Sequence, residues 1–491
     1  MHRFAFHRKA KSRAAISLQG AHLVGNDGVP LRGEITQAKG EIRCQTRSQE
    51  AAGISLLWNI QGFGTVQIQT TRLPPRDKPY HLQIELARHR LLCITLKLEE
   101  WGLFDYPGME DTLAEIDAAR DLFIQALQRV EDPLAAAELA DRSLEKAMWA
   151  SENMGRFHAS VFLNRRRQSA GFSKQFLGLT MPASTSKVGL PRRLGDGFDS
   201  VRIPFTWRDI QPEEQRTDYD TADAWVKACA ESKLAIRGGP LLNFGVRSVP
   251  DWMYIWENDY EAIFDFAREH VRRTVQRYGR QITSWTVASG LHAENVFAFN
   301  FEQIMDLTRM AAAITKQHSA RAPIILDITQ PWGEYYARNP RTIPPLLYAD
   351  MAVQSGISFD AFGLQFLFGI ASPGYHLRDM FQISSMIDRL ANLGKPLHIT
   401  ALAVPSANPD GENGGRWHGE WSDETQAEWL AQFCEIALSK PYVESVCMQS
   451  LEDGISDGLP QGGVLREDLT PKPAFTRLGE LRRSLLPETG K

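Results

Sequence analysis

Short runs of alternating apolar and polar residues open the chain and predict a β-rich region. Turn residues separate these runs, and Asn26-Asp27-Gly28 and Gly62-Phe63-Gly64 are the clearest examples. The predicted strands cover residues 14–18, 40–46, 54–58 and 65–70. Because side chains of a strand point alternately to its two faces, such runs can cover a core on one side. We therefore expect a small, sandwich-like β domain over residues 1–76.

Residues 77–167 show helical spacing instead, with apolar residues recurring at intervals of three and four. Segments 112–127 and 133–163 are rich in Ala, Leu, Glu and Arg. Pro133 stands where the first turn of a helix accepts proline. We expect a helical connector here. The basic run at residues 164–167 is expected to end it as a solvated helix terminus beside a domain boundary.

Beyond residue 168, short β-branched or apolar runs alternate with longer amphipathic segments. This alternation is typical of the βα units of a parallel sheet. The predicted strands cover residues 175–179, 200–203, 235–237, 282–287, 324–328, 361–365, 397–401 and 446–449. Two of the intervening helices carry start signals. Thr221 can cap one of them, and Asp423 with Gln426 forms a capping box before another.

The composition indicates a soluble globular protein of two or three domains. The chain has 491 residues, 43% of them hydrophobic, and a formal net charge of −4, which creates no strong field for a polyanion. We therefore expect no nucleic acid partner. We also expect no membrane partner, because no stretch reaches the roughly 18 uninterrupted apolar residues that span a bilayer. The sequence does not indicate an oligomeric state.

The cysteine pattern favours a reducing compartment. Five cysteines are scattered without a Cys-x-x-Cys pair, and no apolar run of a secretory signal follows the basic N-terminus. We therefore expect a cytoplasmic protein. The sequence contains no His-Glu-x-x-His motif and no Gly-x-Ser-x-Gly elbow, and Gly195-Asp196-Gly197 lacks the lysine of a phosphate loop. We accordingly expect no metal and no cofactor.

Short motifs follow one another across about 300 residues of the predicted βα region. They are Tyr219-Asp220-Thr221-Ala222-Asp223 before Ile236-Arg237-Gly238, then Val249-Pro250-Asp251-Trp252, Arg277-Tyr278-Gly279 before Trp285-Thr286-Val287, Phe362-Gly363-Leu364-Gln365, Leu397-His398-Ile399-Thr400, the segment 432–438, and Pro471-Lys472-Pro473-Ala474-Phe475. Their order resembles glycoside hydrolase family 10, the xylanase family. That family has an RGH strand, a PxW loop, a WDVVNE strand, a GLQxH strand, an ITELD strand and a terminal PKPAY. The resemblance implies a (β/α)8 TIM barrel over residues 168–488.

The same comparison of motifs implies that the chemistry of the family is lost. Retaining glycoside hydrolysis needs two carboxyl groups about 5 to 5.5 Å apart, one as nucleophile and one as acid and base. Ser289 and Gly290 stand where WDVVNE has Asn and the acid/base Glu, and Ala401 stands where ITELD has the nucleophilic Glu. Neither Gly290 nor Ala401 can ionise or attack. We expect both catalytic positions to be vacated.

Other family positions around the same subsite are also replaced. The replacements are Ile203, Pro204, Thr206, Gly239, Asn243, Leu367 and Gln449. Trp207, Arg237 and Gln365 keep the family pattern, so the resemblance implies substrate contacts for these three residues.

Aromatic residues in the predicted βα loops are further candidates for sugar binding. Trp332 follows the fifth predicted strand, and the long loop 405–422 after the seventh contains Trp417 and Trp421. A flat indole face can stack on a sugar ring, although packing of these rings onto the barrel rim is an equally good interpretation. The expected substrate contacts are Trp207, Arg237, Asn243, Trp332, Gln365, Trp417 and Trp421.

Several carboxylates just past the predicted strands are candidate replacements for the missing pair, because TIM barrels place catalytic groups at the C-terminal strand ends. They are Glu334, Asp327, Glu294, Glu452 and Asp453. Glu334 is the most site-like, since the surrounding segment 330–336 combines an acid with aromatic residues and a proline. For each acid alone, a loop cap or a surface charge is the ordinary interpretation, because one carboxylate is no mechanism.

Three functions therefore stay open. The first is a member of the resembled family that binds a β-1,4-glycan or an oligosaccharide without retaining hydrolysis. The second is an active, xylanase-like O-glycosyl hydrolase that uses relocated carboxylates. The third is a structural or interaction protein whose helical connector holds a partner, which an exposed apolar stripe on that connector would favour.

Overall fold

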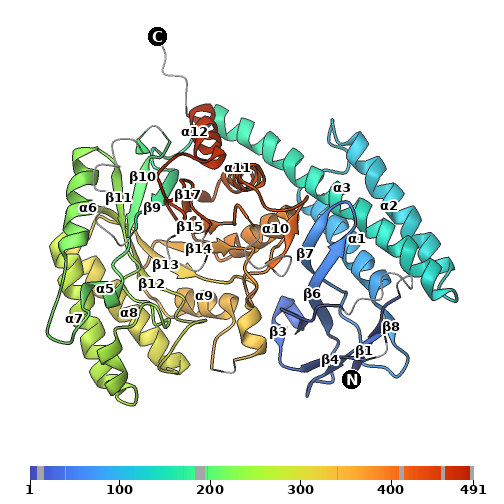
Figure 1. The fold of residues 1–491 in the computed structure, drawn as a ribbon, viewed down its shortest axis with the longest axis horizontal. Coiled ribbons are helices and arrows are strands. Elements are labelled where there is room, and N and C mark those ends of the chain that lie inside the picture. Colours follow the sequence, from blue (N-terminus) through green and yellow to red (C-terminus); the bar gives the residue numbers. More distant parts are fainter. Residues whose placement is uncertain are drawn as a thin grey trace, which may run out of the picture.

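The computed structural model describes residues 1–7, 16–38, 40–169, 171–182, 194–195, 197–339, 341–407, 414–454, 459 and 461–486. The N-terminal strands form two sheets at one end of the molecule, and a closed barrel forms the other end (Figure 1). Three long helices lie beside the N-terminal sheets (Figure 1). The chain is therefore a multidomain (β/α)8 protein with a sheet-rich and helical region before the barrel.

The N-terminal part contains eight described strands. They are β1 His2–Ala5, β2 His22–Val24, β3 Pro30–Leu31, β4 Glu34–Ala38, β5 Glu41–Gln45, β6 Gly53–Ile60, β7 Gly64–Gln69 and β8 Tyr80–His81, with the short helix η2 Asn26–Gly28 between β2 and β3. One sheet has the order β4-β5-β1-β8, and the other has β16-β7-β6-β2-β3. Three predicted strands correspond to β5, β6 and β7. The strand predicted over residues 14–18 is wrong for 16–18, which form no strand, while 14 and 15 lie outside the described residues.

The helical segment contains α1 Leu82–Glu100, α2 Glu110–Gln128 and α3 Pro133–Gln168. Asp132 caps α3, because its side chain accepts a hydrogen bond from Ala135 N at 3.3 Å. Pro133 occupies the first turn, as predicted. In the described part of the chain, no helix has the length and apolarity that crossing a membrane requires.

The basic run lies at the end of α3, which finishes at Gln168, and residues 164, 165 and 167 are exposed, as predicted. The expectation of a solvated terminus is wrong for Arg166. Its guanidinium donates hydrogen bonds to the carbonyl oxygens of Leu438, Lys440 and Val443, each at 2.9 Å. The C-terminal end of α3 is therefore tied to the segment that leads into the last barrel strand.

The barrel consists of eight parallel strands that close on themselves. They are β9 Leu177–Thr180, β10 Ser200–Ile203, β11 Ala235–Gly238, β12 Ile282–Ser289, β13 Ile324–Ile328, β14 Ala361–Leu367, β15 Leu397–Ala403 and β17 Val443–Met448. The order around the barrel is β10-β11-β12-β13-β14-β15-β17-β9. Each of the eight predicted strands overlaps one of these. Their residues are mostly buried because helices cover the outside and side chains fill the inside.

The helices and short helical turns of the barrel follow the expected alternation with strands. They are α5 Trp207–Ile210, α6 Asp220–Glu231, η3 Asp251–Trp256, α7 Tyr260–Tyr278, α8 Phe301–His318, η4 Glu334–Ala337, α9 Pro345–Gln354, α10 Met380–Ala391, α11 Asp423–Ser439 and α12 Pro473–Leu485. The two predicted caps are wrong. Thr221 lies inside α6, and Ser422 rather than Asp423 caps α11, where its extended backbone lets the hydroxyl accept from Thr425 N at 3.1 Å.

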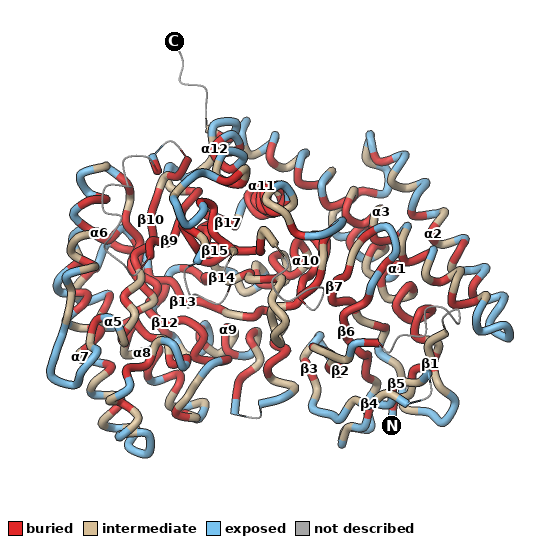
Figure 2. Tube along the Cα trace, viewed as in Figure 1, coloured by how far each residue is buried: buried red, intermediate tan, exposed pale blue. Residues whose placement is uncertain are grey.

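The barrel and the N-terminal part share a sheet. The short strand β16, Arg416–Trp417, comes from the loop after β15 and pairs antiparallel with β7. Buried residues of β6, β7, α3 and the barrel strands also belong to one hydrophobic cluster, and Figure 2 shows buried positions on both sides of the boundary. We call the contact between residues 1–168 and the barrel the junction.

Candidate functional site

The ends of β12 and β15 carry no ionisable group at the two positions that the sequence singles out. Gly290 follows Ser289, the last residue of β12, and has a left-handed backbone with φ 69°. A Cβ built there would lie 3.3 Å from the side chain of Thr329, so a larger residue would be both strained and crowded. Ala401 is buried within β15, where it pairs with Gln365 of β14.

Asp327 of β13 joins these strand ends in one hydrogen-bond network. Gln365 Nε2 donates to Asp327 Oδ2 and to Ser289 Oγ, both at 2.9 Å, and Thr400 Oγ1 donates to Asp327 Oδ1 at 2.8 Å. Asp327 is 1% exposed, and burial raises the pKa of its carboxyl although Arg202 and the hydrogen-bond donors oppose that change. Burial of this carboxyl therefore works against the ionised form that a nucleophile needs.

Little space remains beside this network. A cavity of about 10 Å³ is lined by Thr329, Gln330, Pro331, Gln365, Leu367, Phe368, Gly374 and Tyr375. A single water molecule needs about that volume. Asp327 also packs directly on the backbone of β14, because a Cβ at Gly363 would lie 1.7 Å from its Oδ1 atom. This cavity cannot hold a sugar ring.

Arg202 of β10 is a polar residue of the barrel that the sequence analysis missed. Its Nη2 atom donates to Gln449 Oε1 at 2.9 Å, and its Nε atom donates to Thr180 Oγ1 at 3.1 Å. Gln449 is one of the replaced family positions, and its side chain is engaged by this hydrogen bond with Arg202. The readable signal was a charged residue between the apolar Val201 and Ile203 of a short predicted strand.

Glu334, the leading candidate acid, is held by an ion pair at the junction. Arg378 Nη2 donates to Glu334 Oε1, Gly374 N donates to Oε2 at 2.8 Å, and His376 Nδ1 lies 3.9 Å from Oε2. Arg378 Nη1 also reaches Gln67 O of β7, at 3.3 Å. Burial by itself would raise the pKa of Glu334, but Arg378 and the neighbouring histidines outweigh it and hold the pKa well below its usual range. Glu334 therefore stays ionised and cannot act as a general acid.

The remaining candidate acids also have structural partners. Asp453 forms a salt bridge with Lys472 at 2.7 Å, and Glu294 Oε1 accepts from Tyr375 Oη at 3.3 Å. Glu452 is 4% exposed and takes part in interactions of its own. Within the described ranges, no three His, Cys, Asp or Glu side chains are grouped so that they could hold a metal ion.

Three of the four candidate tryptophans are packed rather than open to a ligand. Trp207 is 2% exposed and stacks on His270 with ring centroids 4.8 Å apart. Trp417 and Trp421 are also buried, and their indole N–H groups donate to Glu152 and to the Gly415 carbonyl. The rim-packing interpretation therefore holds for loop 405–422, of which residues 408–413 lie outside the described residues.

Trp332 differs from these tryptophans, because it is half-buried and faces the junction, with the guanidinium of Arg378 over its ring at 5.0 Å.

Two further candidate contacts, Arg237 and Asn243, make hydrogen bonds within the protein. Arg237 donates to Ser445 Oγ and to Gln175 O, which lie near the N-terminal ends of the strands and so opposite the expected active face. Asn243 Oδ1 accepts from Gly245 N at 2.8 Å and closes a turn.

Buried ion pairs across the junction were missed by the sequence analysis. Arg90 of α1 binds Asp379 through two hydrogen bonds of 2.5 and 3.1 Å, and Lys97 of α1 binds Asp388 at 2.8 Å. Asp379 also caps α10 in a capping box with Gln382, and that three-residue spacing could have been read from the sequence. The pairing with Arg90 could not, because 289 residues separate the partners.

Comparison with known families gives a match over most of the barrel. Residues 204–480 match the family model described as Glycosyl hydrolase family 10. Endo-1,4-beta-xylanase B of Thermotoga neapolitana is 20% identical over 296 residues, which are 57% of this chain and 79% of that protein. Endo-1,4-beta-xylanase/feruloyl esterase of Xylanibacter ruminicola is 22% identical over 237 residues, which are 44% of this chain and 31% of that protein.

Solved structures give similar coverage. Xylanase 10B from Thermotoga petrophila RKU-1, in complex with xylobiose, aligns with a TM-score of 0.48 and 17% identity over 66% of this chain and 97% of that one. The structure of GH10 from Paenibacillus barcinonensis aligns with a TM-score of 0.48 and 19% identity over 68% of this chain and 99% of that one.

Proposed function

Since this chain belongs to glycosyl hydrolase family 10, we propose that it binds a β-1,4-glycan or an oligosaccharide without performing the retaining hydrolysis of the family. Family membership supports a glycan as the class of ligand. One observation carries the second half of the proposal: Gly290 and Ala401 stand at the two strand ends where retaining hydrolysis needs carboxyl groups.

The environment of the remaining acids supports binding without cleavage. A retaining mechanism requires one ionised carboxylate free to attack and one carboxylic acid free to donate its proton. The carboxyl of Asp327 is buried, with a raised pKa, and accepts hydrogen bonds from Gln365 and Thr400, whereas the carboxylate of Glu334 is paired with Arg378. Each acid is thus already engaged by protein partners, and neither is free for the role it would have to take.

The names of the relatives indicate which glycans to test first. Both curated relatives are named endo-1,4-beta-xylanases, so xylo-oligosaccharides are the first ligands, and cello-oligosaccharides are the natural comparison.

The proposal is tested by isothermal calorimetry of the full chain against xylo- and cello-oligosaccharides, followed by product analysis over several days. We expect saturable binding heat and no new reducing ends. Release of products would contradict the proposal and favour relocated carboxylates. In that case Glu334→Gln and Asp327→Asn would identify the acting group, with the surface variant Arg309→Gln on α8 as the control.

A second candidate function, binding of a protein partner, is favoured by the surface of the helical segment. Among the described residues, seven of the twelve exposed large apolar side chains lie between residues 92 and 134. They are Leu92, Leu96, Phe104, Ile124, Leu127, Val130 and Leu134. Clustered apolar exposure is typical of interaction sites. Absence of any glycan binding, together with a concentration-dependent mass in light scattering that Leu96→Lys abolishes, would favour this candidate.

A further inference from the structure

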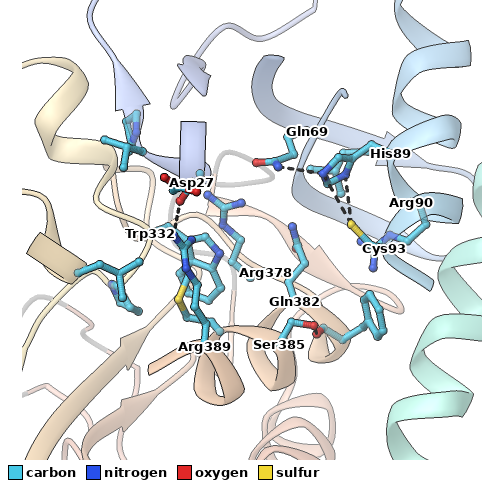
Figure 3. Close-up of a pocket in the computed structure, with 18 of the residues that line it drawn as sticks. Asp27, Gln69, His89, Arg90, Cys93, Trp332, Arg378, Gln382, Ser385 and Arg389 are labelled. Carbon is cyan, nitrogen blue, oxygen red and sulfur yellow. Dashed lines mark hydrogen bonds between the residues drawn. The ribbon is translucent and has the colours of Figure 1, made fainter. Parts of the chain in front are cut away.

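A cavity of about 280 Å³ lies at the junction, where the N-terminal sheet, the helical segment and the barrel meet (Figure 3). Its wall includes residues of η2, β7, α1, α3, α10 and the loop after β13. This volume is close to the lower end of the range for small-molecule sites. Asp27 and Gly28 are exposed residues of its wall, so the cavity reaches the surface at the turn between β2 and β3.

Most of the cavity wall is apolar. Trp332, Leu346, Phe381 and Met386 contribute from the barrel, and Ile68 and Leu86 contribute from the N-terminal part. Of the four candidate tryptophans, Trp332 alone is not fully buried. An apolar wall with an indole favours a ligand with a flat apolar body, because such contacts remove apolar area from water on both partners.

Arg378 supplies an unsatisfied donor on this wall. The residue is 2% exposed, and its Nη atoms bind Glu334 and the Gln67 carbonyl, but its Nε atom has no hydrogen-bond partner. Figure 3 shows Arg378 between Trp332 and Gln382. Buried donors in native proteins are nearly always paired, and an unpaired one is costly.

Arg389 of α10 supplies a second group of donors. Its Nη2 atom donates to the carbonyl oxygen of Asp27, and no carboxylate of the described residues forms a salt bridge with it. Burial lowers the pKa of Arg389, although the Asp27 carboxylate opposes that change. The other N–H groups of this guanidinium are available for a carboxylate, which it can bind in a bidentate geometry.

The remaining charges around the cavity are balanced. Asp379 pairs with Arg90, and Glu334 pairs with Arg378. Burial lowers the pKa of His89 to about 4, so its ring is neutral and binds Gln69 at 2.9 Å. Asp27 is the carboxylate among the lining residues, and it lies at the exposed rim. The charged donors that the wall offers to a ligand are therefore those of Arg389.

We propose that the junction cavity binds a small organic carboxylate with an apolar ring. The ring lies against Trp332 and the aliphatic wall, and the carboxylate accepts hydrogen bonds from the guanidinium of Arg389. This site goes beyond the proposed glycan function, because it lies at the junction and requires no glycoside chemistry.

The test is calorimetry of the full chain with three probes: 3-phenylpropanoate, the neutral 3-phenylpropan-1-ol and the polar acid D-glucuronate. We expect 3-phenylpropanoate to bind at least tenfold more tightly than the other two, and to raise the melting temperature of the protein. Equal binding of the alcohol would overturn the anionic part of the proposal. Tighter binding of glucuronate would overturn the apolar part, and silence with all three probes would overturn both.

Two variants link the binding to this cavity. Arg389→Gln removes the charged donor and should weaken 3-phenylpropanoate at least tenfold. Ser385→Phe fills the cavity from α10 and should abolish binding while the melting temperature is retained, because the serine hydroxyl bonds only within its own helix, to Phe381 O at 2.8 Å. Arg309→Gln, on the surface of α8, should bind as the wild type does. Unchanged binding by Arg389→Gln would refute the assignment, whatever the outcome with oligosaccharides.

Discussion

Buried carboxyl groups have uncharged partners at the strand ends of the barrel and cationic partners at the junction. At the strand ends, burial raises the pKa of Asp327, whose carboxyl accepts hydrogen bonds from neutral side chains. At the junction, the carboxylates of Asp379 and Asp388 are paired with Arg90 and Lys97. The space differs too, about 10 Å³ beside the strand ends and about 280 Å³ at the junction.

This difference indicates that the stability of the junction, more than that of the strand ends, depends on ionised side chains. A buried ion pair gains little over an apolar contact, but losing one partner leaves an uncompensated charge that costs far more than the pair contributed. Charges at the junction therefore couple the helical segment to the barrel. At the strand ends, by contrast, the partners of Asp327 are the uncharged side chains of Gln365 and Thr400.

The largest expected effect comes from breaking the Arg90–Asp379 pair at the junction. Arg90→Ala leaves the Asp379 carboxylate buried, 1% exposed, without its cation. We expect the free energy of unfolding to fall by about 3 to 5 kcal/mol, measured by urea denaturation. Arg309→Ala removes a surface pair with Asp306 and should cost under about 1 kcal/mol. A loss of similar size in both variants would remove the contrast between the two regions.

A smaller effect is expected from acid. Burial would raise the pKa of Asp388, but Lys440 and Lys97 outweigh it and lower the pKa from 3.8 to about 2. The folded state therefore binds the proton less tightly than the unfolded state does. This contribution, about 2 kcal/mol, is fully present above pH 4 and is lost as the pH falls from about 4 to 2. Urea denaturation across this range should show a smaller loss of stability in Asp388→Asn than in the wild type, by about this amount.

The pKa of Asp327 is shifted in the opposite direction from that of Asp388. Its pKa is raised in the folded state, so its contribution to stability is present below its unfolded pKa and declines as the pH rises through the folded pKa. Relative to the wild type, Asp327→Asn should therefore gain stability with rising pH. The same slope in Asp388→Asn and Asp327→Asn would show that the two regions do not differ as described.

The smallest expected effect concerns the backbone conformation at Gly290, which follows β12. Gly290 has φ 69°, so Gly290→Ala should lower the free energy of unfolding by about 1 kcal/mol. Gly155→Ala in α3 is the matched control, since a Cβ there meets nothing within 4 Å and the helical position favours alanine. We therefore expect no loss for Gly155→Ala. An equally tolerant Gly290 would mean that this strand end can accept side chains, the family's glutamate included.

Much of the barrel could be predicted because its signals are local. Each strand is a short apolar run between amphipathic segments, and this alternation needs no knowledge of the partner strand. Helix starts were less predictable. Thr221 and Asp423 are good capping residues, but Tyr219 and Ser422 occupy the cap positions. Several neighbouring residues can serve as caps, and the path of the chain decides between them.

For the candidate site, the residue types could be predicted from the sequence, whereas the contacts between the side chains could not. The residues at 290 and 401 can be read directly, whereas the grouping of Asp327, Gln365 and Thr400 depends on closure of the barrel. Trp417 stands in a long loop and resembles a sugar platform in the sequence. It is buried because its strand pairs with β7, whose partner residue Gly64 lies more than 300 positions earlier.

By itself, the sequence determined the alternation of strands and helices, the order of the family motifs and the absence of carboxylates at positions 290 and 401. Only the tertiary structure decided that Glu334 is bound by Arg378, that the tryptophans at 417 and 421 are packed, and that a cavity opens at the junction. The physical reason is range. Periodicity and side-chain identity act over a few residues, whereas ion pairs, burial and cavities depend on groups that only folding brings together.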